Sequence, residues 1–175
     1  MKLFRIFCIL VTMIFSTIGC AYVRVPKQIP PISLGIIGPY TEKLSVDLIN
    51  NQPDSTLHVY AGQGGFTCSA NYNQWTNFFI EKLAEELKKR NTVVSKDSQN
   101  KLKVKLSDFA FIQGFWKVRV NMKIKLEMPD KNWEKEWVAT DTSGWNDGRA
   151  FGSVIYNVIL GLLKDHEFIE KLNVR

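Results

Sequence analysis

The sequence is poor in the residues from which metal centres and many catalytic sites are built. It contains 3 cysteines and 2 histidines among its 175 residues. The histidines, His58 and His166, are far apart, and no zinc-type spacing, nucleophile elbow or P-loop accompanies them. We therefore expect no metal, no cofactor and no catalytic residue, and we predict that the protein is not an enzyme.

An apolar run long enough for a permanent membrane span is also missing. Lys2 and Arg5 precede an apolar stretch over residues 6–18, which ends at Gly19 and Cys20. A spanning helix needs about 20 apolar residues. A basic start followed by a shorter apolar run is instead typical of a secretory signal. We predict that residues 1–19 are a signal peptide and are removed.

Residues 17–20 read Thr-Ile-Gly-Cys and resemble the lipobox of bacterial lipoproteins. The resemblance implies that the thiol of Cys20 receives a diacylglyceryl group and that Cys20 becomes the mature N-terminus. Stable anchoring takes two or more acyl chains. By family analogy an Asp after the cysteine favours the inner membrane, so Ala21 points to the outer membrane, with the protein facing the periplasm. An uncleaved anchor, or ordinary cleavage that leaves Cys20 free, stays open.

Cys68 is the remaining cysteine once Cys8 leaves with the signal and Cys20 carries lipid. A single thiol of this kind is most often a part-buried small hydrophobe. Three alternatives stay open: an intermolecular disulfide, a Cys20–Cys68 bridge if Cys20 is not acylated, and a thiol enzyme in which His58 assists Cys68.

Length and composition predict one domain behind a tether. About 156 residues remain after the signal, enough for a single core. Residues 20–39 are rich in helix- and sheet-breaking residues, which predicts a semi-extended lipidated tether followed by a domain over residues 40–175. These residues are Pro26, Pro30, Pro31, Gly35, Gly38 and Pro39.

Hydrophobic periodicity predicts an α+β domain. Alternation of apolar and polar residues indicates five strands, at residues 44–48, 57–61, 101–106, 117–128 and 133–140. Helical spacing indicates one helix over residues 73–90 and a second from Phe151, with a shorter helical tail through Leu172. Clean alternation is typical of sheets covered on one side, so we predict an antiparallel sheet of about five strands with two helices packed on one face. Gly152 and Gly161 in the second helix indicate close packing against the sheet.

Basic residues gather on one face of two predicted strands. Glutamates at 127, 134 and 136 could neutralise part of this face by cross-strand pairing, and a solvated sheet face has to be polar in any case. The functional alternative is a surface for an anionic lipid, a cell-wall polymer or an acidic protein. The candidate residues are Lys101, Lys103, Lys105, Lys117, Arg119, Lys123 and Lys125.

The net charge of +6 falls by two, to +4, without Lys2 and Arg5. Such a modest excess of positive charge is compatible with anionic binding partners in the envelope but does not require them. Nucleic acid is not an expected partner in that compartment.

Two loop features are weaker candidates. The glycine-rich residues 62–65 favour a turn over a phosphate-binding nest, because the spacing and lysine of a P-loop are absent. Among Trp116, Trp133, Trp137 and Trp145, core packing is expected for some, and Trp145 with Arg149 is the pair most favoured to be exposed.

The predicted order of signal, strands and helices resembles that of the YajG-like lipoprotein family. It resembles more loosely the auxiliary lipoproteins of envelope transport and cell-wall synthesis machines. The resemblance rests on the lipobox-like residues 17–20, the strands at 44–48 and 117–128, and the two predicted helices. It implies a non-enzymatic interaction or assembly module with an envelope protein partner. The alternatives are a carrier that binds a lipid or peptide between sheet and helices, and a periplasmic thiol enzyme using Cys68.

Overall fold

The computed structural model describes residues 20–27, 29–63, 66–113, 116–144 and 147–173. The predicted signal peptide lies outside these ranges. Within them the chain forms eight strands, three α-helices and one short 3-10 helix, η1 (Pro129–Lys131). In chain order the strands and α-helices are β1 (Cys20–Arg24), β2 (Ser45–Asn50), β3 (Leu57–Gln63), β4 (Phe66–Asn71), α2 (Tyr72–Lys88), β5 (Val93–Val94), β6 (Lys101–Gln113), β7 (Val118–Met128), β8 (Trp133–Ser143), α3 (Asp147–Lys164) and α4 (His166–Leu172).

The fold is α+β, and its larger sheet has five strands in the order β5-β2-β6-β7-β8. β6, β7 and β8 are antiparallel, but β2 is parallel to both β5 and β6. The prediction of a purely antiparallel sheet is therefore wrong. The chain forms β3, β4 and α2 between β2 and β6, and a crossover of that length allows a strand to return in the parallel direction.

A second, smaller sheet has the order β1-β4-β3. The strand predicted at residues 57–61 belongs here rather than to the larger sheet, because β3 forms an antiparallel hairpin with β4. β1 pairs in parallel with the other edge of β4. β4 reads Phe-Thr-Cys-Ser-Ala-Asn, whose small and polar residues give no clear alternating pattern, and so the sequence did not indicate it.

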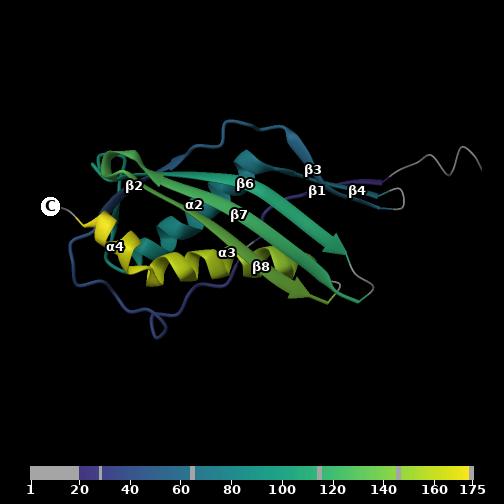
Figure 1. The fold of residues 1–175 in the computed structure, drawn as a ribbon. Coiled ribbons are helices and arrows are strands. Elements are labelled where there is room, and N and C mark those ends of the chain that lie inside the picture. Colours follow the sequence, from purple (N-terminus) through teal and green to yellow (C-terminus); the bar gives the residue numbers. More distant parts are fainter. Residues whose placement is uncertain (1–19, 28, 64–65, 114–115, 145–146, 174–175) are drawn as a thin grey trace, which may run out of the picture.

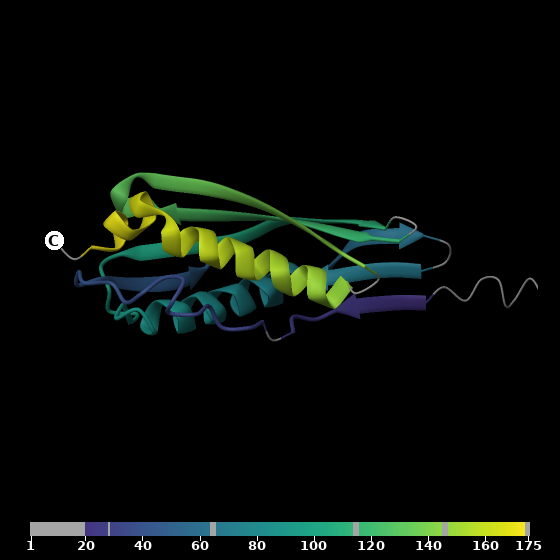
Figure 2. The same ribbon diagram turned by 90° about the horizontal axis from the view of Figure 1, so that it is seen from below.

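The core lies between one face of the larger sheet and the helices α2 and α3, which lie side by side on that face (Figure 1; Figure 2). β7 alternates along its length: the side chains of its even-numbered residues from Val118 to Met128 are buried and the others are less so. α2 begins after Asn71, whose side-chain oxygen accepts the amide hydrogen of Gln74 (2.9 Å).

Gly161 shows how closely α3 approaches the sheet. A Cβ atom built on Gly161 would lie 2.5 Å from Cζ3 of Trp137 on β8, well inside van der Waals contact. At Gly152 the nearest atom would be Cγ2 of Ile29, at 3.3 Å. The prediction of close packing against the sheet is confirmed at Gly161 and is wrong at Gly152, which packs against the N-terminal segment.

Residues 25–27 and 29–43 form a strap that lies against α2 and α3 (Figure 2). Ile32 is buried, the amide of Tyr40 donates to the Arg90 carbonyl (3.0 Å), and the Tyr40 hydroxyl donates to the Leu163 carbonyl (2.9 Å). In place of the semi-extended tether predicted over residues 20–39, the first five residues form β1, and Ile29, Ile32 and Ile37 pack against the hydrophobic core. None of the helices in the described ranges combines the length and apolar composition that crossing a membrane requires.

Candidate functional sites

Cys20 is the first residue of β1, and its backbone already belongs to the smaller sheet. The pairing with β4 runs from Cys20 opposite Phe66 to Arg24 opposite Ala70. No length of chain separates the lipidation candidate from the folded domain. A group attached at position 20 would therefore be joined to the domain without an intervening tether.

Buried contacts hold β1 in place. The guanidinium of Arg24 lies 4.6 Å from the centre of the Tyr22 ring and donates to the Tyr22 hydroxyl (3.2 Å). The indole N–H of Trp75 on α2 donates to the Arg24 carbonyl (3.2 Å). Burial raises the pKa of the neighbouring Tyr60 hydroxyl to about 12, with Cys68 adding to the shift and Arg24 opposing it. Tyr60 is therefore neutral at physiological pH.

Cys68 is a half-buried free thiol on β4, beside Tyr60. His58 is engaged elsewhere: its Nε2 atom lies 2.7 Å from Oδ2 of Asp54, and its ring stacks on Tyr72 with centroids 4.4 Å apart. No hydrogen bond joins His58 to Cys68 in the part of the chain that the structure describes. The geometry does not assemble the thiol–imidazole pair that a cysteine nucleophile needs.

The face of the larger sheet that points away from the helices, here called the open face, carries the basic candidates together. Acidic residues interrupt them, because Lys123 pairs with Glu136 (2.9 Å) and Lys125 pairs with both Glu127 (2.7 Å) and Glu134 (2.9 Å). The hydrogen bonds from Glu127 and then Glu134 raise the pKa of Lys125. Within the described ranges no ion pair is found for the other five candidates, Lys101, Lys103, Lys105, Lys117 and Arg119.

The tryptophans divide between core and surface. Trp133 is buried, with its ring 5.9 Å from that of Phe168, and Trp137 packs under Gly161. Trp116 is 69% exposed, which the sequence did not single out. Trp145 and residues 64–65 of the glycine-rich loop lie outside the described residues.

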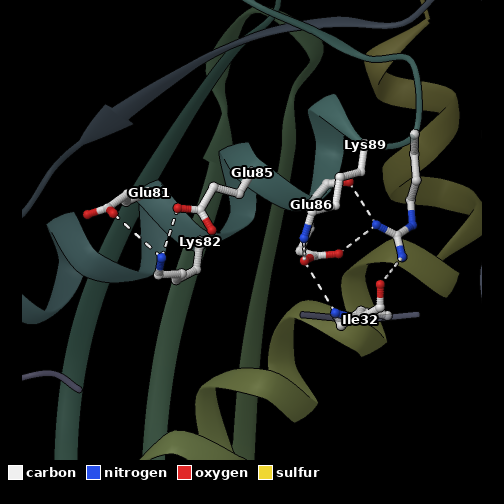
Figure 3. Close-up of polar contacts among 7 residues, drawn as sticks. Ile32, Glu81, Lys82, Glu85, Glu86 and Lys89 are labelled. Atoms are coloured by element: carbon white, nitrogen blue, oxygen red, sulfur yellow. Dashed lines mark hydrogen bonds and ion pairs between the residues drawn. The ribbon is translucent and has the colours of Figure 1, made fainter. Parts of the chain in front are cut away.

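A buried ionic cluster joins the strap to α2 (Figure 3). The side chain of Arg90 is fully buried, and its guanidinium donates to Oε2 of Glu86 (2.7 Å) and to the carbonyls of Glu86 (2.8 Å) and Ile32 (3.3 Å). The Ile32 amide donates back to Oε1 of Glu86 (3.3 Å), and Lys89 adds a second ion pair (2.6 Å).

Burial by itself would raise the pKa of Glu86, but the hydrogen bonds from Lys89 and Arg90 outweigh it and hold that pKa below its ordinary value. The hydrophobic periodicity of the helix does not show that Glu86 and Arg90 are buried. The i,i+4 spacing of Glu86 and Arg90 is the signal that could have indicated their pairing.

A cavity of about 220 Å³ lies beside this cluster. Small-molecule pockets usually enclose roughly 300–1,000 Å³. Lys82, in its wall, is already paired with Glu85 (2.8 Å) and Glu81 (3.6 Å), as Figure 3 shows. The wall is formed by Ile29, Pro30, Pro31, Ile32, Lys82, Glu85, Glu86 and Ile159.

A second gap lies among the described residues between the larger sheet and α2. The gap found there, beside Trp75, Phe79 and Met122, is too small for a water molecule. The described residues also contain no group of three His, Cys, Asp or Glu side chains placed to hold a metal ion.

Comparison with known proteins adds a likeness of fold only. No protein-family model matches the sequence, and no curated protein matches it. A crystal structure of a Xanthomonas campestris protein described under the family DUF330 is similar over 87% of this chain and 95% of its own, with 12% identity and a TM-score of 0.48. A second, uncharacterized protein is 13% identical, with a TM-score of 0.37, over 81% of this chain and 95% of its own. At these TM-scores neither likeness supports a statement about function, and the YajG-like resemblance stays a prediction.

Proposed function

We propose that the protein is a lipid-anchored, periplasm-facing lipoprotein that acts as a non-enzymatic interaction or assembly module of the bacterial envelope. The observation that carries the proposal is the lipobox-like sequence at residues 17–20 behind a basic and apolar leader. The expected location is the outer membrane.

A binding role is favoured over catalysis by the geometry around Cys68. His58 is held by Asp54 and Tyr72, and the described residues offer no enclosed reaction chamber. The open face, by contrast, is broad and charged. Lys101, Lys103 and Lys105 form its basic end on β6, where an acidic envelope protein is the expected partner.

Acylation is tested by intact-mass analysis of the full chain purified from membranes. Wild type should lack residues 1–19 and carry fatty acyl groups on Cys20, whereas Cys20→Ala should carry none and should keep its leader. Cys68→Ser is the matched control and should be processed like wild type. An unmodified Cys20 in the wild-type protein would refute the proposal.

The partner surface is tested by crosslinking in intact envelopes followed by mass spectrometry. A partner protein should crosslink through the lysines of β6, and charge reversal at Lys101, Lys103 and Lys105 should abolish that adduct. Lys88→Glu with Lys164→Glu, at exposed positions on the two helices, serves as the control and should leave the adduct unchanged. An adduct that survives reversal on β6 would place the partner elsewhere and contradict this part of the proposal.

A further inference from the structure

The position of Cys20 within a strand determines how the domain would meet a bilayer. Because Cys20 already belongs to β1, acyl chains on that residue would be joined to the domain without an intervening linker. We infer that the end of the domain bearing Cys20, here called the anchor end, docks on an anionic lipid bilayer through Tyr22, Ile112, Trp116, Lys117 and Arg119. The inference rests on the proposed lipidation and adds an orientation and a contact surface to it.

Several segments that are distant in sequence meet at the anchor end. The start of β1, the end of β3, the start of β4, the end of β6 and the start of β7 all lie at the end of the molecule opposite the C-terminus (Figure 1; Figure 2). Backbone register agrees, because Gln63 lies opposite Phe66, which lies opposite Cys20. A bilayer that receives the chains from Cys20 would therefore face these strand ends as well.

The exposed apolar side chains at this end are of the kind that favours a membrane interface. Among the described residues, the large hydrophobic side chains that are exposed include two aromatic ones, Trp116 (69%) and Tyr22 (49%), and both lie at the anchor end. Tryptophan and tyrosine prefer the headgroup level because one part of the ring system is apolar and the other is polar. Ile112, 53% exposed and opposite Arg119 in the ladder between β6 and β7, adds an aliphatic side chain at this end.

The charges at the anchor end suit an anionic surface. Lys117 and Arg119 are exposed, and the residues opposite Arg119 in the neighbouring strands are Ile112 and Thr142, neither of them acidic. Farther along the same face, Lys125 is neutralised by Glu127 and Glu134. Basic residues close to a bilayer are attracted by anionic headgroups, and the attraction falls off within about 10 Å at moderate salt.

The contact is tested with a photo-crosslinking amino acid in the full, acylated chain, reconstituted in vesicles of phosphatidylethanolamine and phosphatidylglycerol. Replacement of Trp116 should give an adduct with the mass of a phospholipid. Replacement of Val93 is the matched control and should give none, because this residue, also exposed (53%), pairs with the start of β2 at the opposite end of the sheet. An unlabelled position 116 would overturn the inference, and so would a protein adduct at position 116 in native envelopes.

The electrostatic part is tested by charge reversal in the same vesicles. Lys117→Glu with Arg119→Glu should lose most of the lipid adduct at position 116, whereas Lys101→Glu with Lys103→Glu, at the far end of the same face, should keep it. The difference between the pairs should vanish in phosphatidylcholine vesicles, and equal losses for both pairs would overturn the role of Lys117 and Arg119. Intact mass of each sample separates the two levels of the proposal: unacylated Cys20 refutes the proposed function, while acylated Cys20 without an adduct refutes only the docking.

Discussion

Ion pairs between acidic and basic side chains lie on both sides of the larger sheet, but they are buried on one side and exposed on the other. On the covered side, Arg90 and Glu86 are paired out of contact with water, and the pair also fixes the backbone of the strap. On the open face, Lys125 keeps about a third of its side-chain surface exposed beside its glutamates. The buried pair would be costly to break, and the exposed pairs would not, so the comparison separates structural charges from charges that are available for a partner.

The largest effect is expected for Glu86→Ala, which leaves the buried guanidinium of Arg90 without its carboxylate and removes a contact of the strap. Removing one partner of a buried pair costs roughly 3–5 kcal/mol. Urea unfolding measures this loss, and the control is Glu85→Ala, one residue earlier, whose half-exposed carboxylate pairs with Lys82 and should matter by less than about 1 kcal/mol. Similar losses of unfolding free energy for the two variants would contradict the distinction between buried and exposed ion pairs.

A smaller effect on the covered side is expected for Gly161→Ala. The added methyl group meets the rigid ring of Trp137 at 2.5 Å, and overpacking of this kind costs about 1–3 kcal/mol, against a gain of roughly 1 kcal/mol in helix propensity. Gly152→Ala meets only the end of the Ile29 side chain, so it should be neutral or stabilising. The melting temperatures of the two variants would rank the sites, and a more stable Gly161→Ala would contradict the tight packing.

On the open face, Lys125→Ala should change the free energy of unfolding much less than Glu86→Ala does, because its ion pairs are exposed. The small loss should shrink further as salt is added, since screening weakens exposed pairs. Urea unfolding at low and high salt checks both points. A salt-independent loss as large as that of Glu86→Ala would mean that the open face is structural.

The smallest effect is expected at a surface turn. Hydrogen bonds from the side chain and backbone of Thr56 lower the pKa of Asp54 from 3.8 to about 2, and His58 contributes. Because the folded-state pKa is depressed, this contribution to stability is present above pH 4 and is lost as the pH falls through about 2. Carboxyl NMR should show this titration, and Thr56→Ala should move the pKa back toward 3.8. An unchanged pKa in that variant would exclude Thr56 as the cause.

Long elements with a regular apolar period were predictable from sequence. The alternation around β7 and the four-residue spacing along α2 repeat enough times to separate strand from helix, and the glycines of α3 indicated its close packing. The α+β class followed from the same patterns. The open-face lysines were predictable as a group because a period of two places alternate residues on one side of a strand.

Short and non-local features were not predictable in this way. β5 has only two residues, β1 lies in a proline-rich stretch, and the parallel pairing of β2 depends on residues more than fifty positions away. The cluster of Glu86 and Arg90 escaped notice because the strap that buries it comes from a distant part of the chain. The exposure of Trp116 depends likewise on where two strands end.

The parallel pairing of β1 with β4 also determines how the domain would respond to tension at its N-terminus. A pull on Cys20 along the strand axis, away from Arg24, loads the whole ladder of backbone hydrogen bonds to β4 at once. A hairpin pulled from its open end would lose such bonds one after another. The smaller sheet would thus be loaded in shear. It could transmit a mechanical load from position 20 into the rest of the fold.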